Sequence, residues 1–316
     1  MPAASPSVSG ACSLCSGPLE TRYPEVRDPY SGERFSIVHC PRCDLGQTAP
    51  VPRDLSKYYP ASYHGGRHGI TANYCVARRA RMLRKTCEDG AGKKLLDIGC
   101  GEGTFLLKAR AEGWSAFGTE LKPEAARSAG IEVWESLEEA AKAAPYDCVT
   151  LWHSLEHVAD PVATVRLARD LMHPDGKLII AVPDAGGLQA RVFAAHWLHL
   201  DVPRHVHHFT QRSIAKLLDA AGFEATEVWH QEFEYDFLGW IQSALNKVLP
   251  EPNVLFSLLT GRRSNGTAWQ KLVSVLGTAL LSVPALMAVV VGTALGQGGT
   301  LVMAAHLQKS LPSNSD

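Results

Sequence analysis

The chain lacks an excess of charge of either sign. Its 31 lysines and arginines nearly balance its 32 aspartates and glutamates, which leaves a formal net charge of −1. Proteins that bind nucleic acid usually carry a basic excess, so this balance argues against a nucleic-acid partner. With 316 residues, the chain can bury a sizeable core in one full domain and still carry an additional module.

The N-terminus lacks the basic cluster and apolar core that mark a secretion signal. We expect residues 1–11 to be a flexible tail and the chain to start in the cytoplasm. Thiols stay reduced in that compartment. The eight cysteines are therefore expected to be metal ligands or buried small residues rather than disulfides.

Charge is also missing from the C-terminal part, where residues 272–308 contain no Asp, Glu, Lys or Arg. Such a run can be a membrane-embedded segment or the last part of a soluble fold. Which of the two applies depends on what the preceding residues build.

Half of the cysteines form two C-x-x-C pairs, CSLC and CPRC. Two such knuckles can turn four thiolates onto one tetrahedral ion, and the stretch between them has the pattern of a connecting hairpin. With no vacant ligand position, the site is expected to be closed and structural. Residues 12–52 are therefore predicted to be a zinc ribbon with the ligands Cys12, Cys15, Cys40 and Cys43. The remaining cysteines have no partner spacing and are expected to be core or surface thiols; they are Cys75, Cys87, Cys100 and Cys148.

Residues 53–92 are expected to form a surface connector, rich in Pro, Tyr and Gly, followed by a helix with a basic cluster. Two interpretations stay open for this cluster: a solvated helix face, or a basic face toward acidic lipid headgroups. Its members are Arg78, Arg79, Arg81, Arg84 and Lys85.

Residues 94–111 have the pattern of a parallel strand, a tight glycine turn and a helix. The next strand ends in Glu120, about twenty residues on, where an acidic side chain can accept both ribose hydroxyls of a nucleoside. Strands and helices then continue to alternate, with Asp160 and Thr210 placed as helix N-caps. This alternation predicts an α/β fold with a doubly wound, Rossmann-like parallel sheet.

The glycine turn reads G-x-G-x-G and not the dinucleotide fingerprint, since Thr104 stands where the last glycine of that fingerprint would be. The stretches LLDIGCGEGTF, TE and PYDCVTLWHSLEHVADP resemble class I S-adenosylmethionine (SAM)-dependent methyltransferases. The resemblance covers residues 93–236 and a final strand within residues 297–310, and it implies an antiparallel last strand in the sheet.

The resemblance also implies where SAM binds. Its methionine end is expected to contact Asp97, Gly99, Gly101 and Gly103, and its ribose Glu120. Its adenine side is expected near Ser136 and Leu137, and its sulfonium beside Trp152 and His153. The last two residues follow a strand at its carboxyl end, where ligands sit in open α/β sheets.

Methyl transfer is an in-line displacement, for which the enzyme supplies position and, with a hydroxyl acceptor, a base. The stretch HSLEHV resembles ubiquinone-biosynthesis O-methyltransferases, which carry Glu-x-x-Glu-His after the same strand. Here His153 replaces the first acid, while Glu156 and His157 match. Spacing of i, i+3 and i+4 would place the three on one helical face. They could hold a catalytic divalent ion, or His157 could orient or deprotonate the acceptor without metal.

A second group of histidines follows the fifth strand, in AHWLHLDVPRHVHHFT. We expect a loop on the carboxyl edge of the sheet, in which His205 and His208 are further candidate bases. The alternative is that these histidines pack and cap around Thr210. The PRHxxHF form also occurs in zinc-ribbon members of the resembled superfamily.

The final strand leaves residues 237–296 as an apolar helical insertion between two paired strands. Both ends of the insertion must then emerge on one side of a membrane, and Pro284 divides the apolar residues 272–296 into two short pieces. We predict a membrane-associating hairpin, with a buried dimer interface as the alternative. The basic residues expected at its base, facing anionic headgroups, are Lys247, Arg262, Arg263 and Lys271.

Together these features predict a SAM-dependent methyltransferase, peripheral on the inner face of the cell membrane, that O-methylates a lipid or lipid-linked small molecule. One alternative is a C- or O-methyltransferase of soluble nucleotide sugars, because the cysteine module is similar to that of deoxysugar C-methyltransferases. Another is a SAM-binding assembly factor without catalytic activity. The charge disfavours a ribosomal RNA methyltransferase.

Overall fold

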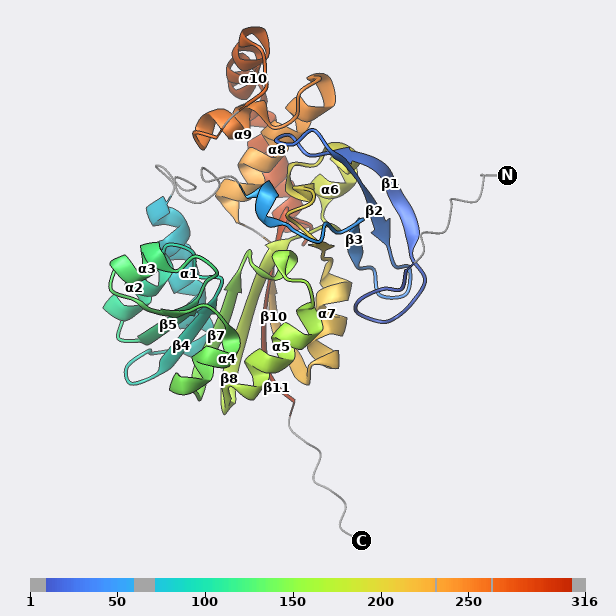
Figure 1. Cartoon of the computed structure of the whole chain (residues 1–316). Helices are drawn as coiled ribbons and strands as arrows, with labels where there is room; N and C mark the ends of the chain where they lie inside the picture. The colour runs from blue at the N-terminus through green and yellow to red at the C-terminus, as the bar shows by residue number, and fades with distance from the viewer. Residues whose placement is uncertain (1–9, 60–71, 231, 263, 309–316) are drawn as a thin grey trace.

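A seven-stranded sheet forms the centre of the molecule (Figure 1). The structure is a computed structural model and describes residues 10–59, 72–230, 232–262 and 264–308. The strands run in the order β10-β11-β8-β7-β4-β5-β6. Their bounds are β4 Lys94–Ile98, β5 Ser115–Thr119, β6 Glu132–Trp134, β7 Tyr146–Trp152, β8 Met172–Pro183, β10 Phe223–Trp229 and β11 Thr300–Leu307. Strands β4 to β8 pair in parallel, whereas β11 is antiparallel to both β8 and β10, which confirms the predicted fold class.

Helices cover both faces of this sheet because its strands are apolar on both sides. Leu95 of β4 packs into one core and Leu96 into the other, as expected for a strand whose side chains alternate. One face carries α1 Ala72–Cys87, α2 Thr104–Ala111 and α3 Glu124–Ser128, and the other carries α4 Leu137–Ala140, α5 Pro161–Asp170 and α7 Gln211–Ala220. The predicted caps are confirmed, since Asp160 accepts a hydrogen bond from Ala163 N and Thr210 forms a capping box with Ser213.

A second, four-stranded sheet forms the N-terminal ribbon, in the order β1-β2-β3-β9. Three of its strands come from the ribbon itself: β1 Glu20–Arg27, β2 Arg34–His39 and β3 Gly46–Ala49. The fourth, β9 His207–His208, comes from the stretch that we expected to be a loop. Buried ribbon residues such as Cys40 and Leu45 join the same core as Phe209 and Ile214. The ribbon thus shares a hydrophobic core with the main sheet and is not a separate module.

The ends of the first segments differ from the sequence-based boundaries. Ala11, expected in the tail, forms a β-bridge with Pro18 and belongs to the ribbon, while residues 1–9 lie outside the described residues. Residues 60–71 of the connector also lie outside them.

The basic residues of helix α1 do not share one environment. Arg78 and Arg79 are nearly buried and pair with Glu232, a carboxylate with no exposed surface. Arg84 pairs with Glu112 and Lys85 with Glu227. Arg84 and Lys85 stay exposed, as a solvated helix face predicts, whereas Arg78 and Arg79 are covered by the insertion, which the charge pattern alone could not show.

Three helices fill the insertion between β10 and β11: α8 Phe233–Val248, α9 Val254–Leu259 and α10 Ala268–Ala294. The insertion begins earlier than predicted, because Phe233 opens a helix whose first turn carries Glu234 and Asp236. Acidic residues stabilise a helix N-terminus. Figure 1 shows α8 to α10 above the edge of the sheet where β7 and β8 end, with the ribbon beside them.

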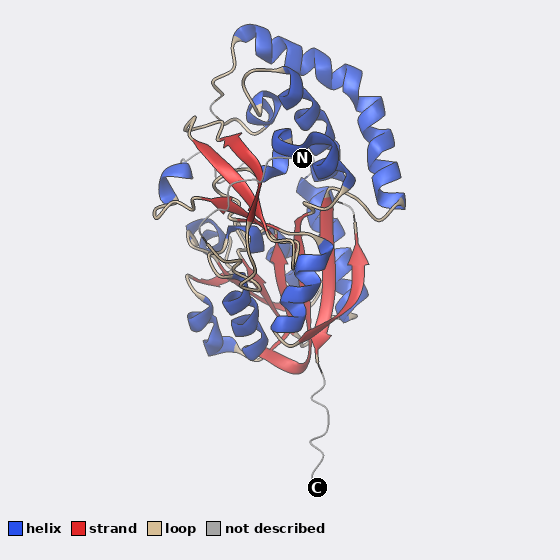
Figure 2. Cartoon of the chain, turned by 90° about the vertical axis from the view of Figure 1, so that its right-hand side faces the viewer, coloured by secondary structure: helices blue, strands red, loops and turns tan. Residues whose placement is uncertain are grey.

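The predicted hairpin at Pro284 is wrong, since α10 is one unbroken helix of 27 residues (Figure 2). Its packing against α8 and α9 explains the difference. Ala285, next to the proline, is buried with Ile241 and Leu245 of α8 and Leu255 of α9. This tertiary contact outweighs the local tendency of proline to end a helix. By length and composition, α10 could cross a membrane. Core helices of soluble proteins can have the same length and composition.

Candidate active site

The glycine turn between β4 and α2 builds the floor of the site. Gly99 and Gly101 have positive φ values of 76° and 57°, which L-residues with a side chain rarely adopt. A Cβ on Gly99 would also lie 2.6 Å from Cβ of Ser154, so the turn after β7 can come close only because residue 99 is glycine. Gly103 has a φ of 76° at the N-cap of α2. The predicted cofactor loop is therefore a tight turn packed against the end of β7.

Asp97 ends up buried beneath this turn. Its carboxylate accepts a hydrogen bond from Oγ1 of Thr150 at 2.7 Å. Burial raises the pKa of Asp97 to about 7, and the Thr150 bond opposes this shift. A positively charged ligand at this position would favour the ionised form, which fits a cofactor that carries an ammonium and a sulfonium group.

Glu120 follows β5 and faces the glycine turn. One oxygen accepts from Gly101 N at 3.0 Å and the other from Lys122 N at 3.3 Å. The residue expected to bind the ribose is thus tied to the loop expected to bind the methionine end. Ser136 and Leu137 follow β6, where Ser136 caps α4 by accepting from Glu139 N.

Trp152 and His153 lie at the carboxyl end of β7, as predicted. Trp152 is buried against Phe105, with ring centroids 5.7 Å apart, and the guanidinium of Arg79 lies 5.3 Å from its ring. His153 adopts a positive φ of 53° and stacks on Tyr235 at 4.6 Å. Burial and the nearby Arg79 hold the pKa of His153 well below its usual range.

Sequence reasoning missed a buried group of charges beside these two residues. Glu232, at the start of the insertion, contacts Arg78, Arg79 and Nε2 of His153. The only sequence signal was the pair of adjacent arginines on α1. This group links the insertion to the sulfonium end of the expected cofactor site.

The helical face predicted for His153, Glu156 and His157 does not form. His153 lies before the turn with its positive φ, and Leu155–His157 is a single 3-10 turn. Nδ1 of His153 still approaches Oε1 of Glu156, at 3.5 Å. The histidine that completes a cluster with Glu156 and His157 is instead His205, from the segment before β9.

Glu156, His157 and His205 place one ligand atom each within 4.8 Å of one another. The two imidazole rings lie 4.7 Å apart at 78°. Nε2 of His205 is 4.0 Å from Oε1 of Glu156 and 3.9 Å from Oδ2 of Asp201. A carboxylate with two imidazoles can bind a divalent ion or move a proton.

Backbone carbonyls set the tautomers of both histidines. Nδ1 of His157 lies 2.9 Å from the carbonyl of Arg204, and Nδ1 of His205 lies 2.8 Å from the carbonyl of His199. Because a carbonyl only accepts, the bond of His205 requires a proton on its Nδ1. Nδ1 of His157 has a second neighbour, Oη of Tyr59 at 3.1 Å, which can accept as well as donate, and the bond to the Arg204 carbonyl requires a proton on this Nδ1 too. In the neutral rings Nε2 then carries the lone pair, which is the form needed by a metal ligand or a base. Burial holds the pKa of His205 well below its usual range, which keeps that ring neutral.

His208, the third candidate base, lies elsewhere. It is buried in β9 and its Nε2 lies 3.0 Å from Oγ1 of Thr48 in the ribbon. His207 contacts Ser13 of the ribbon in the same way. These two histidines pack where the ribbon meets the main sheet, through Thr48 and Ser13, whereas the alternative interpretation expected them around Thr210. The cluster with Glu156 contains His157 and His205.

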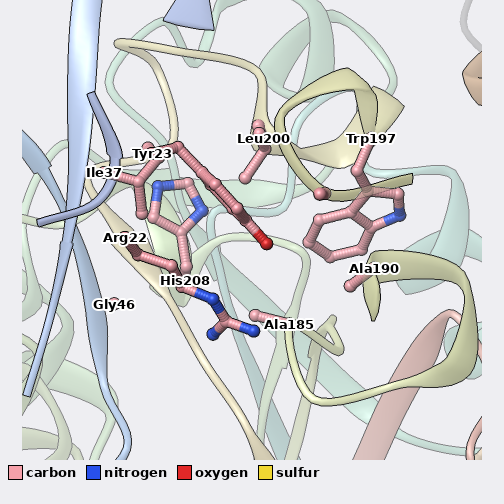
Figure 3. A pocket seen from close by; sticks show the side chains of 10 residues that line it. Arg22, Tyr23, Ile37, Gly46, Ala185, Ala190, Trp197, Leu200 and His208 are labelled. Carbon is pink, nitrogen blue, oxygen red and sulfur yellow. The ribbon is translucent and has the colours of Figure 1, made fainter. Parts of the chain in front are cut away.

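His208 also lines a cavity between the ribbon and α6 Leu188–Phe193, together with Tyr23, Trp197 and Leu200 (Figure 3). The cavity holds about 10 Å³, which is about the room of one water molecule. It is therefore too small for an acceptor and marks an imperfection in the packing of this joint.

The four ribbon cysteines gather as a metal site requires. Sγ of Cys12 lies 3.3 Å from that of Cys43, and Sγ of Cys15 lies 3.5 Å from that of Cys40. Burial raises the pKa of Cys12 and Cys43. Although burial also acts on Cys15, its hydrogen bonds from Gly17 and the neighbouring thiols lower its pKa to about 7. A thiolate therefore forms readily in this cluster, and four thiolates suit a tetrahedral zinc ion.

Comparisons with known proteins agree with this geometry. A family model described as a methyltransferase domain matches residues 67–228. The chain is 37% identical to the ubiquinone biosynthesis O-methyltransferase of Escherichia coli O9:H4, over 37% of this chain and 54% of the relative. It is 29% identical to that of Aromatoleum aromaticum, over 44% of this chain and 67% of the relative. The matched part thus spans between one half and two thirds of these relatives, and the ribbon lies outside the matched family segment.

Among solved structures, the chain resembles a SAM-dependent methyltransferase from Archaeoglobus fulgidus. The two are 16% identical with a TM-score of 0.47, over 80% of this chain and 99% of the other. It also resembles the 1,6-didemethyltoxoflavin-N1-methyltransferase of Burkholderia thailandensis, at 17% identity and a TM-score of 0.48, over 87% and 96% of the two chains.

The buried His208 makes stability depend on pH. Burial lowers its pKa in the folded protein to about 3, whereas in the unfolded chain it is about 6.5. Between these values unfolding takes up a proton, so stability falls as the pH drops below about 6.5. We expect His208→Gln to make this fall shallower, by up to about 1.4 kcal/mol per pH unit. Urea unfolding at several pH values between about 7 and 5 measures the slope. Equal slopes for the variant and the unsubstituted protein would contradict this, and the exposed His196→Gln is the matched control.

Proposed function

Because the chain belongs to the methyltransferase domain family and is a SAM-dependent methyltransferase, we propose that it O-methylates a lipid or lipid-linked acceptor at the cytoplasmic face of a membrane. The observation that carries this proposal is the position of Glu156, His157 and His205. They adjoin the expected sulfonium site, and the insertion above that site presents an apolar outer face.

The chain's own residues supply cofactor placement. The cofactor would bring a methyl group on a positively charged sulfur. Asp97 and the glycine turn would hold its methionine end, Glu120 its ribose, and Ser136 with Leu137 its adenine side. Trp152 and His153 would lie beside the sulfonium. The glycine conformations and the buried Asp97 fit this assignment.

His157 would act as the base. Nε2 of His157 would take the proton of the acceptor hydroxyl, so that the oxygen could attack the methyl carbon that the cofactor would supply with its sulfur as the leaving group. The carbonyl of Arg204 holds the tautomer that this step needs. Glu156 and His205 stand beside the ring and would orient it. If the three side chains bind a divalent ion instead, Nε2 of His157 is a ligand and not the base, and the ion would make the acceptor hydroxyl more acidic.

The ubiquinone biosynthesis relatives support oxygen as the acceptor atom. In this chain Glu156 and His157 match the Glu-His of their motif, while His153 stands in place of the first acid. Nε2 of His153 contacts Glu232, whereas ligand atoms of Glu156, His157 and His205 lie within 4.8 Å of one another, which is why we assign the third position of the cluster to His205.

The outer face of α10 supports a membrane location. Its exposed side chains are apolar, among them Leu276, Leu280, Val283 and Met287, each more than half exposed. Contiguous apolar patches of this kind mark interaction sites. Since β10 and β11 pair in one sheet, both ends of α10 return to the same body, so the helix would lie in the membrane interface and not across it.

The basic residues predicted where the insertion leaves the main domain are only partly exposed. Lys247 is exposed and Lys271 half-buried. Arg262 is buried against Phe256 and Tyr30 and does not face outward, and Arg263 lies outside the described residues. Membrane attraction would therefore come mainly from apolar burial.

The cysteine ribbon favours a second candidate, methylation of a soluble nucleotide sugar, since it is similar to the module of deoxysugar C-methyltransferases. The two candidates differ in whether the protein needs a lipid surface.

We expect the ribbon to bind one zinc ion per chain through Cys12, Cys15, Cys40 and Cys43. Cys40→Ser should abolish zinc, measured by elemental analysis of the purified protein, and lower the midpoint of thermal unfolding. Cys75→Ala, at a buried cysteine outside the ribbon, should keep the metal. Full zinc content in the Cys40 variant would rule out this site.

We expect His157→Ala to lower kcat by about a hundredfold or more, the range for loss of a general base. Transfer of labelled methyl to lipid extracts measures activity, and calorimetry measures SAM binding, which should stay unchanged. His196→Ala is the control. Full activity would remove His157 from the mechanism, and tight SAM binding without transfer by the unsubstituted protein would favour the assembly-factor alternative.

We expect the intact protein to float with vesicles that contain anionic lipid. Replacing Leu276, Leu280, Val283 and Met287 together by Gln should abolish flotation, because these residues form one exposed stripe at helical spacing. Replacing exposed Leu107 and Val192 by Gln should not. If nothing floats and the quadruple variant turns a dimer into a monomer on size exclusion, the face joins two copies, and nucleotide sugars become the first acceptors to test.

A further inference from the structure

Arg204 is the largest fully buried side chain among the described residues. Its guanidinium donates to Asp28 of the ribbon at 2.8 Å and to Asp201 at 2.7 and 3.0 Å. It also donates to the carbonyl of Tyr58, and the ring of Tyr30 lies 4.9 Å away. A buried guanidinium is tolerated only when it is paired in this way.

Asp28 is equally buried and is held from the ribbon side. One carboxylate oxygen binds Arg204, while the other accepts from N and Oγ of Ser31 in the turn between β1 and β2. Asp28 and Asp201 thus balance the charge of Arg204 together, and the ribbon hairpin fixes the position of Asp28.

The backbone around Arg204 reaches the candidate base directly. The Arg204 carbonyl accepts the Nδ1 proton of His157, and Val206 N donates to the carbonyl of Glu156. From the ribbon, Thr48 donates through Oγ1 to the carbonyl of His205 at 2.6 Å and through N to that of Val206. Residues 204–206 are therefore held between the ribbon on one side and the turn that bears Glu156 and His157 on the other.

We propose that the ribbon is a positioning element of the active site, and that Asp28 acts through Arg204 to fix the tautomer and orientation of His157. The side chains of Asp28 and Arg204 are fully buried, so they would act through residues 204–206 and not by direct contact with a ligand. Residues 201–206 contain no regular helix or strand, so their backbone conformation depends on these side-chain contacts. The ribbon thereby serves the reaction and not only the stability of the fold. This inference rests on the proposed role of His157 as the base.

The test replaces Asp28 by Asn, which keeps the shape and the Ser31 contacts but removes one of the two carboxylate charges that face Arg204, leaving that of Asp201. In protein labelled with nitrogen-15 at histidine, NMR reports which ring nitrogen of His157 is protonated, with His157→Gln used to assign the signal. We expect Asp28→Asn to lose the pure Nδ1-protonated signal. We expect kcat to fall by about tenfold to a hundredfold, the effect of misplacing a reacting group, while the Kd for SAM stays unchanged.

Glu25→Gln is the matched control, because Glu25 forms an exposed ion pair with Arg34 in the same hairpin. Should Asp28→Asn fail to fold, Thr48→Val removes one hydroxyl bond to the same segment and should shift the His205 signal in the same experiment. Unchanged ring-nitrogen signals and kcat in Asp28→Asn would overturn the proposal. A changed His157 signal combined with full activity of His157→Ala would instead uphold the positioning contact and refute the base.

Discussion

The pairing of β11 between β8 and β10 is the constraint on which the rest of the structure depends. The last strand enters the sheet between the edge strand β10 and β8, pairing from Thr300 opposite Pro183 to His306 opposite Lys177, and its residues 300–305 are buried. The insertion must therefore leave after β10 and return to the start of β11 beside the carboxyl end of β8. That edge is where ligands bind in open α/β sheets. The same pairing that completes the core thus places α8, α9 and α10 over the site.

Buried charge pairs hold the three parts of the molecule together at this edge. The ribbon meets the segment before β9 through Asp28 and Arg204, and the insertion meets α1 through Glu232, Arg78 and Arg79. Such pairs add little net stability compared with apolar contacts, but a missing partner is strongly unfavourable. Their main effect is therefore on specificity. Any other arrangement of the ribbon or the insertion on the main domain would leave a buried ion without its counter-ion.

Local signals allowed much of the fold to be predicted. The glycine turn at residues 99–103, the caps Asp160 and Thr210 and the cysteine pairs each depend on neighbours in sequence, and the structure has all of them in place. What could not be predicted depends on distant partners. His205 lies near Glu156 because the following residues, β9, pair with β3, and the two residues of β9 carry no sequence signal for a strand. Pro284 stays within α10 because α8 and α9 pack against that helix. Arg79 turns inward toward an acid from the insertion.

The position of β11 in the chain also has a consequence for biosynthesis. Because a ribosome delivers the chain from its N-terminus, α10 emerges before the strand that fills the gap between β8 and β10. During that interval the flanks of β8 and β10 are unpaired, and the most apolar helix is exposed with no completed domain beneath it. Closure of the sheet by β11 is therefore the last step of folding, and until it occurs the apolar surface of α10 has no completed domain beside it.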